Sequence, residues 1–265
     1  MEQGNGVECS GRIALTIQYD GTKFNGWQIQ NGGVTVQGEI EKAIRVFLKR
    51  DIRVLGSGRT DAGVHALGQV AHFDVPEKVS LRRLCIALNG ILPREISITN
   101  AYRVTGDFHA RFGAVARAYR YIIYNHPLKS PFTANRAMWL HDRLDLEYLR
   151  AVSEHLLGEM DFASFCKKSE SKGINTVRRI TSVEIRDKKD WIFFEIQGNG
   201  FLHHMVRIMV GTLIEMHRKQ ADPSLMAEVI AKRDRVFGGF TAPACGLYLR
   251  RVFYYPPLDM MDSAF

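Results

Sequence analysis

The carboxylate of Asp61 is the side chain in this sequence whose setting best suits chemistry. It lies in the segment Gly58–Ala66, with Arg59 two residues before it and Gly63 two residues after it. A guanidinium beside a carboxylate keeps the carboxylate ionised and can orient it, which suits a nucleophile or a base better than a general acid. Asp, Ala and Gly in succession are also ordinary turn residues. The residue types alone therefore allow a catalytic loop or a structural turn.

β-rich residues lie on both sides of this segment. Residues 52–55 precede it and residues 69–74 follow it. We therefore expect Asp61 on a loop held at both ends by a sheet, where rigid scaffolds usually display reactive groups.

The charge of the chain indicates an acidic partner. Its 265 residues carry a formal net charge of +8 at pH 7, and 46% of them are hydrophobic, as in an ordinary globular protein of one large or two average domains. Nucleic acid is the first candidate partner and an anionic membrane surface the second. No apolar run reaches transmembrane length. Residues 1–10 are typical of a disordered lead-in and not of a signal peptide, so we expect a cytoplasmic protein.

The cysteines show no spacing that would bind a metal. They are Cys9, Cys85, Cys166 and Cys245. None forms a Cys-x-x-Cys pair, and no zinc pattern is present. Isolated thiols in a reducing compartment are the economical interpretation, and a nucleophilic Cys166 is the alternative.

Strand-like and helix-like segments alternate in a similar order in the two halves of the chain. The predicted strands are residues 11–19, 117–124, 179–186, 191–197 and 247–254. The predicted helices are residues 36–49 after a Thr35 cap, 81–90 after a Ser80 cap, 145–157, 202–219 and 222–232. Two α+β halves follow, residues 11–112 and 113–265, each a mainly antiparallel sheet with helices on one face, and the sheets side by side around a central cleft.

Six blocks of this sequence resemble the TruA-type tRNA pseudouridine synthases. They are Gly58–Ala66, Tyr19–Gln28, Asp107–Phe112, Ala118–Tyr121, Phe201–Arg207 and Thr241–Leu249. The blocks follow the family's order over nearly the whole chain. One departure is Ile29, where family members often carry a basic residue.

The resemblance implies a pseudouridine synthase fold with a basic cleft, and an enzyme that isomerises uridine to pseudouridine. It implies a tRNA substrate, modified at uridines 38, 39 and 40 of the anticodon stem-loop, and a homodimer with one tRNA spanning both subunits. The reaction breaks one glycosidic bond and re-forms a bond to carbon without redox change. One carboxylate can therefore suffice, and we expect no cofactor and no metal.

The resemblance also assigns a catalytic set. Asp61 is implied to be the carboxylate that attacks C1′, adds to C6 of the ring or removes the C2′ proton. Tyr119 is implied to stack on the flipped uracil, although the strand pattern places it equally well in a core beside Tyr121. Arg207 is a charge on an apolar helix and needs a partner, which the resemblance implies is Asp61.

Five further residues are candidates for substrate binding. Arg59 is placed to meet a phosphate, because flipping a nucleotide requires a grip on its backbone. Leu247 matches the aliphatic residue under the reacting base, and by itself would be core. His65 could equally bond the loop backbone. His203 and His204 favour RNA contact or packing over a metal, because neighbours on a helix point about 100° apart.

Other basic residues could add a broad RNA surface. They are Lys23, Arg82, Arg83, Lys167, Lys168, Lys172, Arg178 and Arg179.

Two other functions remain open. The first is an RNA-binding protein that keeps the fold without catalysis, against which the intact Asp61, Tyr119 and Arg207 argue. The second is a hydrolase that pairs Asp61 with Asp74 or Asp107, since a glycosidase needs two carboxylates.

Overall fold

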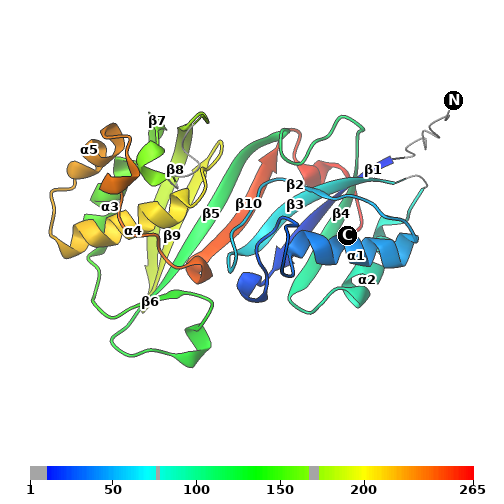
Figure 1. Ribbon diagram of the computed structural model, residues 1–265, viewed down its shortest axis with the longest axis horizontal. Helices are drawn as coiled ribbons and strands as arrows, with labels where there is room; N and C mark the ends of the chain where they lie inside the picture. Colours follow the sequence, from blue (N-terminus) through cyan, green and yellow to red (C-terminus); the bar gives the residue numbers. More distant parts are fainter. Residues whose placement is uncertain (1–10, 76–77, 167–172) are drawn as a thin grey trace. The chain divides into compact units, whose positions relative to one another are not determined.

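The chain folds as an α+β protein of two compact units in this computed structural model (Figure 1). The structure describes residues 11–75, 78–166 and 173–265. Unit 1 runs to Val115 and includes Arg251–Phe265, and unit 2 is Ala116–Arg250. The predicted halves met at residue 113 and left the C-terminus in the second half. The predictions on residues 1–10, Cys9, Lys167, Lys168 and Lys172 lie outside the described residues.

Unit 1 is built on an antiparallel sheet. Its strands are β1 (Gly11–Tyr19), β2 (Leu55–Gly56), β3 (His65–Val75), β4 (Ile96–Val104) and β11 (Asp262–Ser263). Their order is β11-β4-β1-β3, and β2 pairs with β3. The strand predicted over 11–19 is confirmed; Ile13, Leu15 and Ile17 are fully buried, although Ala14 between them is buried as well.

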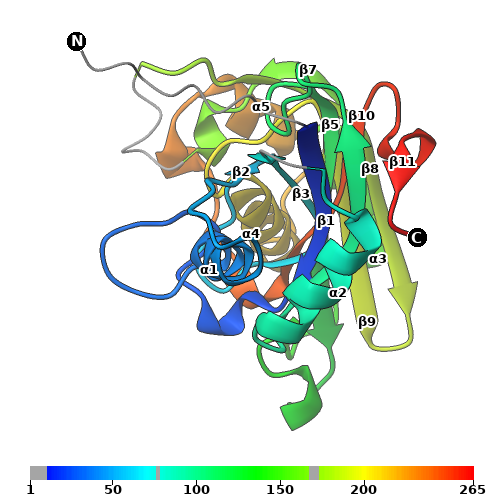
Figure 2. The same cartoon turned by 90° about the vertical axis from the view of Figure 1, so that its right-hand side faces the viewer.

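Two capped helices cover one face of this sheet (Figures 1 and 2). They are α1 (Val36–Leu48) and α2 (Leu81–Ile91). Both predicted caps are confirmed, since the hydroxyl of Thr35 accepts from Gly38 N and that of Ser80 from Arg83 N. The C-terminal segment packs on a separate cluster, in which Leu258 and Met261 lie against Tyr102. The chain's end therefore belongs to the core of unit 1.

Unit 2 contains mainly antiparallel strands together with helices. Its strands are β5 (Ala114–Asn125), β7 (Gly158–Asp161), β8 (Val177–Lys188) and β9 (Trp191–Gly198), in the order β5-β9-β8-β7, with β6 (Met138–Leu140) parallel to β5. Its helices are α3 (Leu146–Glu154), α4 (Met205–Arg218) and α5 (Leu225–Ala231). Strand residues Ile123 and Phe194 line one apolar pocket with Leu149 of α3 and Leu213 of α4. The chain leaves unit 2 within β10 (Leu247–Tyr254), a strand predicted with these bounds.

Several predicted helix ends are wrong. The helix predicted over 202–219 begins at Met205, because His204 has a left-handed φ of 64°. The helix predicted over 145–157 stops at Glu154, shortly before Gly158 turns the chain into β7 with a φ of 113°. Asp222 and Pro223 form a turn, and α5 starts only at Leu225.

Strand β4 was not predicted from the sequence, and α2 extends beyond its predicted end at residue 90. The helix predicted over 81–90 continues to Ile91. The Asn89 side chain donates to Ile98 O (2.8 Å) and accepts from Ile98 N (2.9 Å), which joins α2 to β4. Residues 52–54 are not strand, and β2 starts at Leu55. Among the described helices, none combines the length and apolar character needed to cross a membrane.

Candidate active site

Asp61 lies on the short loop between β2 and β3 of unit 1. Its backbone carbonyl accepts from Val64 N at 3.1 Å, and Gly63 adopts a φ of 77°. The tight turn predicted from the residue types is therefore present. Asp61 itself is half-buried, and Arg59 on the same loop is exposed, where a phosphate could reach it.

Gln69 of β3 holds the first half of this loop. Its buried amide oxygen accepts from the Ser57 hydroxyl at 2.6 Å, and its amide nitrogen donates to Gly58 O at 2.9 Å. Ser57 N also donates to Val70 O at 2.7 Å. The loop is thus tied to a central strand just before Asp61, as expected of a loop that displays a reactive group.

The second support is the block Tyr19–Gln28, for which the sequence predicted a strand end at Tyr19 but no contact with the Asp61 loop. Trp27 N donates to Thr60 O at 3.1 Å, and the Tyr19 hydroxyl lies 2.8 Å from the Thr60 hydroxyl, with both groups buried. Thr60 immediately precedes Asp61. The opening block therefore supports the Asp61 loop through its contacts with Thr60.

Two glycines allow this close approach. A Cβ on Gly21 would clash with the Val64 carbonyl oxygen, and a Cβ on Gly26 would come within 2.5 Å of Thr60 O. Gly26 also has a φ of 82°, which L side chains rarely adopt. The sequence signal that could have revealed this support was the two glycines, Gly21 and Gly26, directly after the predicted strand that ends at Tyr19.

His65 is buried, with 1% of its surface exposed. Its Nδ1 accepts from Gly21 N at 3.1 Å, and the same nitrogen lies 3.1 Å from Asp20 Oδ1. This arrangement links the end of the Asp61 loop to the opening block. It favours a structural role for His65, whose backbone partner belongs to the opening block and not to the loop as predicted.

Tyr119 and Tyr121 lie on the same strand, β5, and both are buried, but their contacts differ. Tyr121 is fully buried and its hydroxyl donates to Pro243 O at 2.8 Å, while burial raises the pKa of that hydroxyl. Gly246 packs on its ring, since a Cβ there would come within 2.6 Å of the ring carbons. Tyr119 instead meets Phe201 edge to face, with centroids 5.0 Å apart. Tyr121 is therefore a core residue, which the strand pattern could not show.

Arg207 of α4 is fastened to the C-terminal block of unit 2. Its Nε donates to Ala242 O at 2.8 Å, and Ala242 N donates back to Arg207 O at 3.1 Å. Glu215, on the same helix, accepts from Phe240 N at 2.9 Å. Leu247 is buried at the start of β10. Unit 2 thus ties the predicted arginine to the predicted block 241–249.

His203 and His204 precede α4 and do not lie on it. His204 is the left-handed residue before the helix, and the two rings are 4.0 Å apart. The geometric argument against a metal assumed helical neighbours, so that argument was wrong. The ring contact itself is packing, one of the two roles expected for the pair.

The predicted site residues are thus divided between the two units. Unit 1 carries Arg59, Asp61 and His65 on one loop and the start of β3. Unit 2 carries Tyr119, His203, His204, Arg207 and Leu247.

The carboxylates proposed for a hydrolase are occupied or poorly suited. Asp74 accepts two hydrogen bonds from Arg12, at 2.7 and 2.9 Å, and the Arg12 hydrogen bond lowers the pKa of Asp74. A hydrogen bond from Thr105 lowers the pKa of the exposed Asp107. A general acid needs a raised pKa, so neither residue supports the carboxylate-pair hydrolase.

The cysteines and basic residues behave as scattered groups. Cys85, Cys166 and Cys245 are not joined in disulfides, and Cys166 is fully buried, which argues against a nucleophile there. Lys23 pairs with Glu95 at 2.5 Å. Burial lowers the pKa of Arg178. Arg82, Arg83 and Arg179 are exposed.

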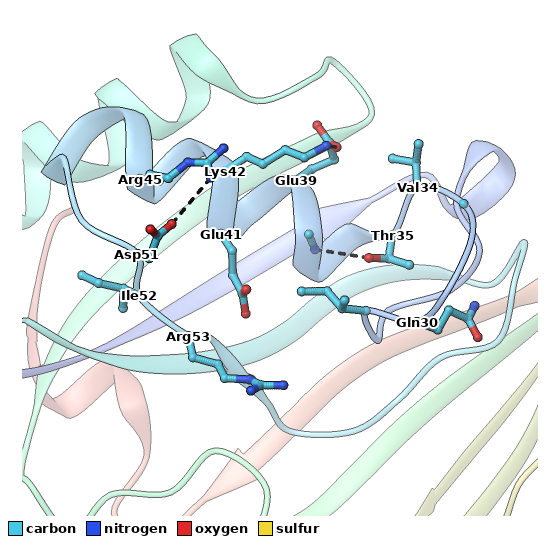
Figure 3. Close-up of a pocket in the computed structure, with 13 residues that line it drawn as sticks. Gln30, Val34, Thr35, Glu39, Glu41, Lys42, Arg45, Asp51, Ile52 and Arg53 are labelled. Carbon is cyan, nitrogen blue, oxygen red and sulfur yellow. Dashed lines mark hydrogen bonds and ion pairs between the residues drawn. The ribbon is translucent and has the colours of Figure 1, made fainter.

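A pocket of 530 Å³ lies in unit 1 beside α1 (Figure 3). None of the predicted site residues lines it. Its carboxylates are engaged: Glu39 pairs with Lys42 at 2.7 Å, Glu41 accepts from Val54 N at 2.9 Å, and Asp51 lies 3.6 Å from Arg45. The pocket is charge-balanced and separate from the Asp61 loop.

Comparison with known proteins identifies the family. A family model described as tRNA pseudouridine synthase matches residues 15–113 and 152–255, which include Asp61 and Arg207 and leave Tyr119 between them. The tRNA pseudouridine synthase A of Paraburkholderia xenovorans (strain LB400) is 43% identical over 243 residues, 92% of this chain and 90% of the relative. That of Shouchella clausii (strain KSM-K16) is 43% identical over 253 residues, 95% of this chain and 97% of the relative. This chain therefore belongs to the tRNA pseudouridine synthase family.

Proposed function

We propose that this isomerase converts uridines 38, 39 and 40 of the tRNA anticodon stem-loop to pseudouridine, with Asp61 as its catalytic carboxylate and no cofactor. Its family membership supports isomerisation of tRNA uridine. The observation that carries the role of Asp61 is its loop, which is held by Gln69 on one side and by the opening block on the other. Rigid support of this kind keeps a reactive group in productive geometry.

The proposed chemistry conserves every atom of the base. The N1–C1′ bond breaks, the uracil turns, a C1′–C5 bond forms, and the C5 proton is lost as N1 gains one. An ionised Asp61 serves as the nucleophile at C1′, as the nucleophile at C6, or as the base at C2′. All three routes need the Asp61 carboxylate. They differ in whether its oxygen attacks C1′, attacks C6 or removes the C2′ proton.

The target nucleotide must leave the helical stack before the carboxylate can reach it. Arg59 is exposed on the Asp61 loop and is proposed to hold a phosphate beside the flipped nucleotide. Tyr119 and Arg207 complete the proposed catalytic set on the strength of the family resemblance. For Tyr119, support comes from its edge-to-face packing on Phe201, which orders the ring. Leu247, His203 and His204 are proposed substrate neighbours, and His65 a support of the loop.

Tritium release tests the reaction directly. The enzyme is given tRNA labelled at C5 of uridine, with uridine at only one of positions 38, 39 and 40 in each substrate. We expect release from all three, because C5 loses its hydrogen only when the base is rejoined through carbon. Release of free uracil would instead indicate a hydrolase. Binding without release from any of these substrates would indicate an RNA-binding protein.

The protein is proposed to be a cytoplasmic homodimer. Sedimentation equilibrium in the absence of RNA is expected to give a mass of twice the 30.1 kDa chain. A mass of 30.1 kDa at micromolar concentration would contradict the dimer and leave the reaction itself untouched.

A further inference from the structure

We propose that Phe112, held in place by its own turn, is a stacking platform for a base of the tRNA substrate, separate from the residues proposed for catalysis. The inference rests on the proposed function, since it takes tRNA to be the ligand. It assigns a role to the motif Asp107–Phe112, which the active-site argument did not use.

The turn of residues 105–113 is closed by one histidine. Nδ1 of His109 accepts from both Arg111 N (3.1 Å) and Phe112 N (3.2 Å). The carbonyl of His109 accepts from Gly113 N at 2.8 Å. The backbone that carries Phe112 is therefore fixed by three hydrogen bonds to a single residue.

The inner side of the turn is anchored to the core of unit 1. His72 of β3 accepts from Ala110 N at 3.2 Å, Arg12 of β1 donates to Phe108 O at 2.7 Å, and the Tyr254 hydroxyl donates to Ala110 O at 2.7 Å. Burial lowers the pKa of His72 to about 4, so its ring is neutral and able to accept at neutral pH. Three strands thus hold the turn rigidly.

Phe112 itself lies at the surface of the turn. Its surface is 78% exposed, although it is a large apolar side chain. The His109 ring supports it at a centroid distance of 4.5 Å, and the Arg111 guanidinium lies 5.6 Å from its ring centre. Because burial of apolar surface is favourable, a flat ligand that covers this ordered ring would gain free energy.

The chemistry of the neighbours favours a nucleic-acid base as that ligand. Single-stranded nucleic acids are bound by exposed aromatic rings on which bases stack, next to cationic groups that track the backbone. Phe112 supplies the ring, Arg111 supplies the cation, and the chain as a whole carries a net charge of +8. A ring held rigid before binding loses little entropy on stacking.

Equilibrium binding to unmodified tRNA tests the platform. Phe112→Ala is expected to raise the Kd roughly 10-fold, with an unchanged dependence on salt, because the lost ring carries no charge. Phe112→Trp is expected to keep wild-type affinity. Arg111→Ala is expected to lower the slope of log K against log salt by about one, the signature of one phosphate contact.

Phe132 provides the matched control. It is 93% exposed on the 3-10 helix Pro131–Thr133 of unit 2, so Phe132→Ala removes an equally accessible ring elsewhere. We expect Phe132→Ala to leave the Kd unchanged, and thermal unfolding of both alanine variants to match wild type. An unchanged Kd for Phe112→Ala would overturn the platform. So would a Phe112→Ala variant that alters the sedimentation mass but not the Kd, since its ring would then contact protein.

The same set of measurements separates the platform from the proposed reaction. Tritium release by wild type with an unchanged Kd for Phe112→Ala would overturn the platform alone. No release by wild type with a raised Kd for Phe112→Ala would overturn the proposed reaction and support the platform.

Discussion

Asp61→Asn is expected to abolish pseudouridine formation while tRNA binding stays at the wild-type level. Asn has nearly the same size as Asp and keeps the loop's backbone bonds, but it has no negative charge and is neither a base nor a useful nucleophile. We expect the single-turnover rate of tritium release to fall by roughly 10⁴-fold or more, the upper range for loss of a positioned catalytic group. The Kd for tRNA, measured in parallel, should change little.

Asp107→Asn is the matched control for this experiment. Asp107 is an exposed aspartate of unit 1, and a hydrogen bond from Thr105 lowers its pKa. It has no place in the proposed chemistry. The Asp107→Asn variant is expected to release tritium at the wild-type rate. Substantial activity in Asp61→Asn, confirmed with Asp61→Ala, would remove Asp61 from the mechanism. An equal loss in both asparagine variants would point to lost RNA attraction instead of lost chemistry.

Gly26→Ala is expected to have the next largest effect, although Gly26 carries no reactive group. The new Cβ would lie 2.5 Å from Thr60 O, so the residue before Asp61 must move. A shift of about 1 Å at a reacting group can cost roughly 100-fold in rate. We expect a loss of this size in kcat, together with a destabilisation of about 1–3 kcal/mol from the clash and the left-handed backbone.

Gly32→Ala separates the two causes. Gly32 has a φ of 80°, close to the 82° of Gly26, but a Cβ there would meet nothing within 4 Å. It should therefore reproduce the backbone strain without moving the Asp61 loop. We expect Gly32→Ala to lower the midpoint of urea unfolding slightly and to leave kcat at the wild-type value. Equal kcat values for the two variants would show that the contact between the opening block and Thr60 does not position Asp61.

Local features of the fold could be predicted from the sequence because their causes are local. The caps at Thr35 and Ser80 were predicted because a hydroxyl before an apolar helical stripe satisfies the helix's own first N–H groups. The strands at 11–19 and 247–254 follow from alternation or β-branched and aromatic content. The hairpin of β8 and β9 follows from its polar turn.

The errors occurred where a distant partner decides the local structure. Strand β4 was not predicted, and its Ile98 is joined to α2 by two hydrogen bonds of the Asn89 side chain. The C-terminal segment looked like part of the second half, but its apolar side chains complete a cluster on unit 1. Neither partner can be identified from the pattern of the segment itself.

By itself, the sequence determined the α+β class, the turn chemistry around Asp61 and, through its motifs, the family. Each of these depends on residues that are close in the chain or on a motif that can be read in order. Only the tertiary structure decided that Tyr121 is a core residue. It also decided that Gly21 and Gly26 let the opening block approach the Asp61 loop closely, and that Phe112 is exposed on a rigid turn. The physical reason is that burial, close backbone approach and hydrogen bonds between distant segments arise only once the chain has folded.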